Sequence, residues 1–218
     1  MNANVMFPLV SAVANPRRAF ATIENINVVG LAVAFCLIQF VVALTLFGSM
    51  HAAAVKVVST NPMLSAAQIP VIVGISLLFA TVLNIFLLAV VSLIMLAVVA
   101  IAGQAVKYRD IFCMLMLAYV PAVIVQCVRG FSVMFGVPIE ATKKWFTLGQ
   151  FFPVPEDGSF RALLNIYDIG DVWVFALVIF GFCKVSKMKT IPAIISSVVI
   201  WGTLLLLLGR MQSAGGAA

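Results

Sequence analysis

The sequence predicts an all-α fold, a polytopic membrane helix bundle with five transmembrane helices and a short N-terminal amphipathic surface helix. Of its 218 residues, 64% are apolar and only 9% are charged, whereas a soluble domain carries about 25% charged residues. Apolar stretches long enough to cross a bilayer follow one another along residues 28–210, and no polar block separates them. We therefore expect one membrane domain, with residues 1–27 ahead of it and residues 211–218 as a flexible tail behind it.

The segment 1–27 is expected to hold a short helix at the cytoplasmic surface of the membrane. Asn15 can cap the N–H groups of a helix start, and the proline after it suits the first helical position. Phe20 and Ile23 are three residues apart and share one face of this helix, whereas two arginines lie elsewhere. A helix of this composition lies flat on an anionic leaflet. The residues expected at the membrane surface are Pro16, Arg17, Arg18 and Phe20.

The first span is expected at residues 28–48, because about twenty apolar residues cross a hydrocarbon core of roughly 30 Å. Its helix should continue beyond the span until Asn61 and Pro62 stop it. Residues 69–103 are apolar throughout, and as one helix they would reach about 52 Å, which exceeds the thickness of a bilayer. Two spans with a tight turn would fit this length, but without an internal proline or charge we favour one tilted span at 74–102.

Three further spans are expected at residues 111–128, 171–185 and 191–209. Pro121 should kink the first of these, because proline removes a helical hydrogen bond. Residues 130–167 are rich in aromatic side chains, which favour the headgroup level, so we place this stretch on the membrane surface. A basic hairpin joins the last two spans, and its lysines are Lys184, Lys187 and Lys189.

The distribution of charge predicts the orientation. The connections on the side of the N-terminus carry seven Lys and Arg residues against two acidic residues, and those on the other side carry six against five. Cytoplasmic connections carry the excess of Lys and Arg in membrane proteins. We therefore expect an N-terminus in the cytoplasm and a C-terminus outside. The positive charges are scattered between apolar segments and form no stripe, so no nucleic-acid partner is expected.

Few ionisable groups lie near membrane depth. Asp168 and Asp171 are three residues apart, a spacing that would suit a cation or proton site on one helical face. Both also stand at the start of the fourth span, where carboxylates cap N–H groups, and we favour this capping role. Arg129 could pair with them if the third and fourth spans pack together, but an arginine at a span end more often snorkels to the interface.

The sequence predicts no catalytic, cofactor-binding or metal-binding residues. His51 has no second ligand at a metal-binding spacing, the four cysteines form no CxxC pair, and no nucleophile elbow or phosphate-binding loop is present. Gln39, Asn84 and Gln126 stand within apolar spans, where such residues most often form hydrogen bonds between helices.

Three short motifs occur along the chain: Asn15-Pro16-Arg17-Arg18-Ala19-Phe20 before the first span, Tyr108-Arg109-Asp110 with Ala118-Tyr119-Val120-Pro121, and Asp168-Ile169-Gly170-Asp171-Val172-Trp173. Together they resemble the YIP (Ypt-interacting protein) domain family in its short bacterial form. The first resembles the start of that domain, and the second is similar to the family's polar loop and following span. The third resembles its Asp-x-Phe-x-x-Trp motif, although Gly170 replaces the usual aromatic residue. The resemblance covers roughly residues 12–208.

The resemblance implies five membrane helices and a multipass protein of the bacterial inner membrane with no catalytic residues. Eukaryotic relatives bind small GTPases partly through a long N-terminal region, and this chain has only about 27 residues there, so GTPase binding is not carried over. The candidate functional or structural polar residues are Arg109, Tyr119, Pro121, Arg129, Asp168, Asp171 and Trp173.

Two functions of different classes are expected. The leading hypothesis is a non-enzymatic protein that organises or partners lipids and other membrane proteins, including copies of itself, with the bilayer as its first partner. The alternative is a small transporter or lipid-moving protein with a polar site near the outer ends of the third and fourth spans. An enzyme of the membrane interface is a third and weaker hypothesis, because the sequence offers no nucleophile, base or metal set.

Overall fold

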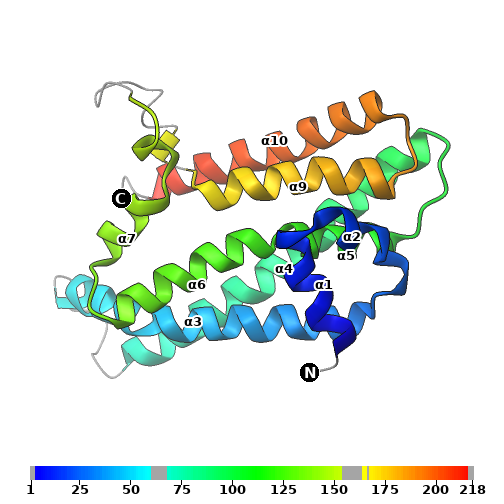
Figure 1. Cartoon of the computed structure of the whole chain (residues 1–218). Coiled ribbons are helices and arrows are strands. Elements are labelled where there is room, and N and C mark those ends of the chain that lie inside the picture. The colour runs from blue at the N-terminus through cyan, green and yellow to red at the C-terminus, as the bar shows by residue number, and fades with distance from the viewer. Residues whose placement is uncertain (1–2, 60–67, 154–163, 166, 216–218) are drawn as a thin grey trace.

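The computed structural model describes residues 3–59, 68–153, 164–165 and 167–215 and forms a bundle of helices (Figure 1). The all-α membrane helix bundle predicted from the sequence is confirmed. In chain order the helices are α1 (Ala3–Ala14), α2 (Pro16–Ala21), α3 (Val28–Ser59), α4 (Ile69–Ile101), α5 (Tyr108–Ala118), α6 (Val120–Met134), α7 (Ile139–Phe146), α9 (Ile169–Val185) and α10 (Thr190–Gly215).

Three helical segments of the described chain are long and apolar enough to cross a membrane. They are Val28–Gly48 in α3, Ile69–Ile101 in α4 and Tyr108–Met134, which joins α5 to α6. Thr190–Leu204 in α10 is apolar but shorter, and α9 has 17 residues. The count of five crossings, which needs α9 and α10 as well, stays a prediction.

Helix α4 settles the choice between one helix and two in the long apolar stretch. It runs without a break for 33 residues, about 50 Å at 1.5 Å per residue. It begins at Ile69 rather than near residue 74, with Pro70 in its first turn, where the missing N–H costs no hydrogen bond. Helix α3 likewise continues beyond residue 48 as far as Ser59, so both helices are longer than a bilayer requires.

The third predicted span is broken in the middle. Helix α5 ends at Ala118 and α6 begins at Val120, with Tyr119 between them and Pro121 in the first turn of α6. This is the position at which the proline was expected to disturb the helix, because its ring removes the N–H that would bond to the carbonyl of Leu117. The combined segment covers residues 108–134, which is longer than the predicted 111–128.

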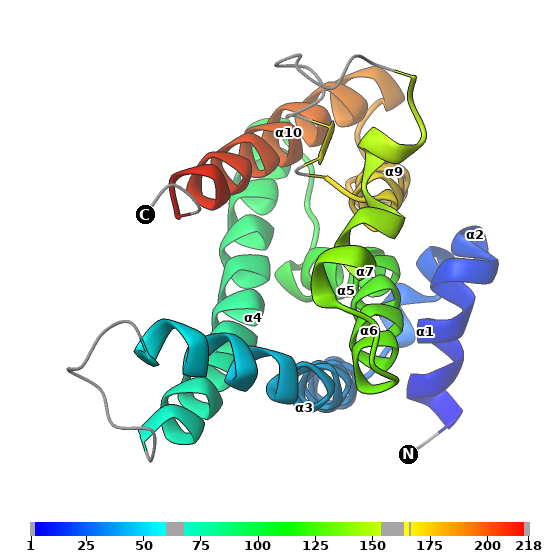
Figure 2. The ribbon, with the colours of Figure 1, turned by 90° about the vertical axis from the view of Figure 1, so that its left-hand side faces the viewer.

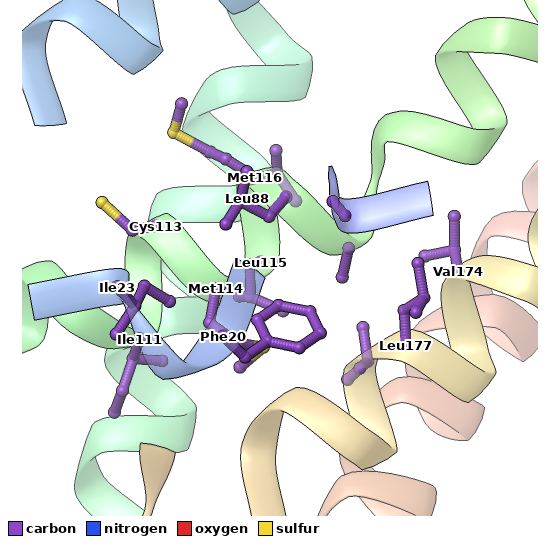
Figure 3. Close-up of a cluster of buried hydrophobic side chains, with 14 of the residues drawn as sticks. Phe20, Ile23, Leu88, Ile111, Cys113, Met114, Leu115, Met116, Val174 and Leu177 are labelled. Atoms are coloured by element: carbon purple, nitrogen blue, oxygen red, sulfur yellow. The ribbon is translucent and has the colours of Figure 1, made fainter. Parts of the chain in front are cut away.

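The helices form a ring in which α4 faces α6 and α9 (Figure 2). Helix α3 packs on α4 and α6 along one side, α10 packs on α9 and α4 along the other, and α5 lies against α4 and α9. The core is densest around α5, where Ile111 and every residue from 113 to 118 are buried (Figure 3). Val174 and Leu177 of α9 complete it.

Helix α2 docks onto this core. Asn15 caps it by accepting a hydrogen bond from the Arg18 amide at 3.3 Å, as predicted. Phe20, expected at the membrane surface, is instead 3% exposed, and its ring centroid lies 6.0 Å from that of Phe180 in α9. Gly181 makes room for the ring, since a Cβ atom at that position would lie 3.1 Å from the Phe20 ring and 2.7 Å from the Met114 Cγ. Pro16 is partly exposed, and Arg17 and Arg18 are exposed.

Helices α3 and α6 approach each other most closely at Gly130. A Cβ atom added there would lie 2.8 Å from the Thr45 Cβ and would collide with the Thr45 hydroxyl oxygen, which donates to the Val42 carbonyl at 2.7 Å. Small residues of this kind let transmembrane helices pack backbone to backbone.

We predict that Gly130→Ala lowers the free energy of unfolding by about 1–3 kcal/mol, the usual cost of overpacking a close contact. Gly48→Ala, on the neighbouring α3, is the matched control because a Cβ atom there meets nothing within 4 Å. Unfolding in detergent, followed by tryptophan fluorescence, measures both. Equal stability of the two variants would contradict the close α3–α6 contact.

Candidate functional site

An ion pair joins the end of α6 to the start of α9. The Arg129 Nη2 lies 3.0 Å from the Asp168 Oδ2, and the two side chains are 21% and 14% exposed. The Arg129 guanidinium also lies over the Phe146 ring of α7, 5.6 Å from its centroid. Arg129 therefore has the carboxylate partner that was the alternative expectation, because α6 and α9 pack closely enough to offer it. Its snorkelling to the interface stays a prediction.

Asp168 and Asp171 form the cap that their spacing predicts. The Asp168 Oδ1 accepts from the Asp171 amide at 2.9 Å, and the Asp171 Oδ2 accepts from the Asp168 amide at 3.0 Å. This reciprocal pair is a capping box, which satisfies two amides that the helix itself leaves unbonded. Gly170 stands between them because a Cβ atom there would lie 3.2 Å from the Ala122 Cα of α6. The aromatic residue usual in the resembled motif would not fit.

A cleft lies beside this pair, between α4 and the α6–α9 side of the ring. Its main cavity has a volume of about 310 Å³ and combines polar and apolar walls. The polar side chains come from four helices, with Gln39 on α3, Asn84 on α4, Gln126 and Arg129 on α6, and Thr142 on α7. Apolar side chains cover the rest of the wall, among them Val42, Leu46, Leu77 and Ile139.

Two smaller cavities extend the cleft. An almost wholly apolar groove of about 140 Å³ lies between α3 and α4, and it shares Ala43, Leu77 and Thr81 with the main cavity. A second cavity of about 70 Å³ shares Asn84 with the main cavity and is lined by Tyr119, Asp171 and Trp201 among others. The cleft therefore has a polar centre with an apolar extension that reaches exposed apolar side chains of α3 and α4, among them Phe40, Leu44 and Leu78.

Hydrogen-bond donors without partners gather at the cleft. Within the described structure, Gln39 Nε2, Arg129 Nε and Trp201 Nε1 are buried and bond to no acceptor. Gln39 and Arg129 line the main cavity, and Trp201 lines the smaller one. A buried donor without a partner costs about 1–3 kcal/mol, so the cleft is suited to a molecule that brings acceptors.

The cleft is closed toward the end of the bundle that carries α2. On the α2 side of Tyr119, Met95 and Val99 of α4 and Met114 and Met116 of α5 are at most 1% exposed. Methionine fills irregular gaps well because its side chain is unbranched and flexible. This buried core lies between the cleft and the α2 end of the bundle.

The remaining predicted residues lie away from the cleft or only border it. Arg109 is at the opposite end, where it pairs with Asp110 at 3.2 Å and donates to the Glu24 carbonyl. Trp173 is 45% exposed on α9, and buried Pro121 lies at the break below Gln126. Gln39, Asn84 and Gln126, which the sequence predicts to form hydrogen bonds between helices, line the main cavity. Their isolated positions within apolar spans were the available signal for a site.

No group of three or more His, Cys, Asp or Glu residues that could hold a metal ion occurs among the described residues. The four cysteines are free. The donors of the cleft, one guanidinium with amide and indole N–H groups, can bind carbonyl and other acceptor oxygens, while Asp171 also lines the smaller cavity and Asp168 pairs with the guanidinium.

A family model described as "Yip1 domain" matches residues 10–211. The chain belongs to the Yip1 domain family. The match takes in α2, the break at Tyr119 and the capping box of α9, the same features that carry the resemblance seen in the sequence. No curated protein and no solved structure matches the chain. Membership in the Yip1 domain family agrees with an integral membrane protein, and it assigns no chemistry to the cleft.

We predict that Arg129→Gln destabilises the protein by about 2 kcal/mol, less than the 3–5 kcal/mol of a fully buried pair because both side chains keep some exposure. Asp168→Asn should cost a similar amount, since asparagine still caps α9 and only the charge is lost. The double variant Arg129→Gln, Asp168→Asn should lower the free energy of unfolding by clearly less than the sum of the two single effects. A double-mutant cycle of unfolding in detergent measures this coupling, and strictly additive effects would contradict the ion pair.

Proposed function

We propose that this Yip1 domain protein is non-enzymatic and organises its membrane by binding an amphiphile of the bilayer in the cleft. The observation that carries the proposal is the gathering of unpartnered donors, Gln39 Nε2 and Arg129 Nε, at a cavity that continues into an apolar groove. A headgroup with acceptor oxygens would occupy the polar centre. Its chain would lie along the groove between α3 and α4.

The cleft is large enough to hold part of a lipid but small for a whole soluble substrate. The main cavity, at about 310 Å³, stands at the lower end of the range for small-molecule sites. The groove adds apolar wall from Phe40, Leu44, Phe47 and Leu78. An amphiphile can leave most of its length in the surrounding hydrocarbon, so a small cavity is sufficient for its headgroup.

Movement of the same amphiphile is the second candidate, favoured by the gathering of Arg129, Asp168 and Asp171 at one end of the cleft. Moving a lipid requires a polar path to the other leaflet. The buried methionines of α4 and α5 oppose such a path. A flux of labelled lipid in proteoliposomes that the double variant Asp168→Asn, Asp171→Asn abolishes without loss of folding would favour this candidate over binding alone.

We predict that Ala43→Phe reduces the retention of co-purified lipid about tenfold or more. Ala43 lies on the wall shared by the cavity and the groove, and a phenyl ring there would occupy the space that the lipid needs. The matched control is Ala97→Phe, an exposed position on α4 that lines none of these cavities. Native mass spectrometry after purification in mild detergent counts the lipid that stays bound.

Equal retention by the two variants would overturn the proposed site. Loss of a co-purifying protein in Ala43→Phe, with lipid retention unchanged, would instead assign the cleft to a protein partner. Thermal unfolding of each variant distinguishes a filled site from a damaged fold.

The orientation belongs to the same proposal. Lys107, Lys184 and Lys187 lie together around one cavity with α2, whereas Arg129 pairs with Asp168 at the other end of α6 and α9. The positive-inside rule then favours a cytoplasmic position for α2 in a bacterial inner membrane, with the cleft toward the outer leaflet.

We predict that alkaline phosphatase fused after Ala218 is active and that green fluorescent protein fused there is dark, because five crossings place that end outside. The same reporters fused within the connection at residues 102–107 should give the opposite result. A cytoplasmic signal after Ala218 would contradict the odd number of crossings.

A further inference from the structure

We infer that this protein has a second site, a pocket at the α2 end of the bundle that binds a phosphate-bearing headgroup. The pocket has a volume of about 360 Å³ and lies between α2, the connection before α5 and the hairpin between α9 and α10. Lys107, Lys184 and Lys187 line it. In the sequence these lysines indicate only the orientation of the chain in the membrane.

The charges around the pocket favour an anion. Two carboxylates, Glu24 and Asp110, line it beside the three lysines. Asp110 is already paired with Arg109 at 3.2 Å, and Arg109 also donates to the Glu24 carbonyl. Within the described part of the chain, no ion pair joins any of the three lysines to a carboxylate. A net positive charge therefore remains available to a ligand.

The backbone conformation of Lys187 supports a role of its side chain in binding an anion. Its φ of 57° places it in the left-handed region, which glycine adopts readily and which is unfavourable for a residue with a side chain. The turn around it is otherwise ordinary, since the Ser186 Oγ accepts from the Met188 amide at 3.3 Å. The turn alone would favour glycine at this position, whereas a role in the pocket requires the ammonium group.

The walls match a headgroup at the membrane surface. Phe20, Ile23 and Val185, which are buried, and Val106 form an apolar floor, and the exposed lysines form the rim. Basic pockets at the ends of transmembrane helices are suited to lipid phosphates, and each lysine near an anionic surface contributes about fivefold in affinity. The packed core separates this pocket from the cleft, so the two sites can be tested independently.

The test compares two double variants that remove the same charge. Lys107→Gln, Lys187→Gln removes two pocket lysines and leaves Lys184, which stands in the last turn of α9, to stabilise that helix end. Lys144→Gln, Lys189→Gln is the control, because both positions are exposed and neither lines the pocket. The full chain is placed in phosphatidylcholine nanodiscs, with or without phosphatidylglycerol or phosphatidic acid, and bound lipid is measured by native mass spectrometry.

The pocket variant should bind the anionic lipids about 30-fold more weakly than the wild type, and the control should bind them within about twofold of it. Inorganic phosphate and glycerol 3-phosphate, added to the discs that contain the anionic lipid, identify the source of the headgroup: competition with the lipid assigns a soluble phosphate, and its absence assigns the lipid. Equal losses in the two double variants would show general surface attraction, and unchanged binding in the pocket variant would also overturn the site.

Lys187→Gly separates ligand binding from folding. It removes the ammonium group and relieves the left-handed backbone, so the melting temperature should rise or stay the same while anionic lipid binding falls. A fall in binding together with a fall in melting temperature would mean that Lys187 acts through the fold, and the proposed site would be wrong.

Discussion

The arrangement of this bundle depends on the contact between α6 and α9, where Arg129 and Asp168 meet at 3.0 Å. A charge near the hydrocarbon must find a partner in the protein or reach water, so this pair holds the ends of two helices at the same level. Gly170 and Gly181 let α9 lie close to α6, α5 and α2. Helix α4, which packs on α3, α5 and α10, then faces α6 and α9 across the cleft.

The parts of this structure that could be predicted from the sequence depend on neighbours in the chain. Apolar length defined the long helices, since hydrocarbon leaves the backbone no partner outside itself. Pro121 located the break between α5 and α6, and Asn15 located the start of α2, because a missing or exposed N–H acts within one turn. The capping box of Asp168 and Asp171 was predictable for the same reason.

What the sequence did not reveal depends on which helices touch. Arg129 and Asp168 are 39 positions apart, and only the packing of α6 against α9 brings them together. Phe20 was expected at the membrane surface because an apolar residue on one face of a surface helix has the same sequence pattern whether lipid or protein covers that face. In the structure α9 covers it, and the ring lies beside Gly181. The cleft is not encoded by any motif, since Gln39, Asn84 and Gln126 come from three helices and meet only when the ring closes.

The two ends of the bundle differ in packing, and this difference bears on function. Around α5 the methionines and leucines are buried, so this end can serve as a base on which α2 docks. Toward Arg129 the helices leave a cavity with buried donors that lack partners, a condition that costs free energy unless a ligand supplies acceptors. The densest packing and the cleft thus lie in different halves of the bundle. With a cleft proposed toward one leaflet and a lysine pocket proposed at the other, such a protein would hold lipids on both sides of the membrane while remaining closed to their passage.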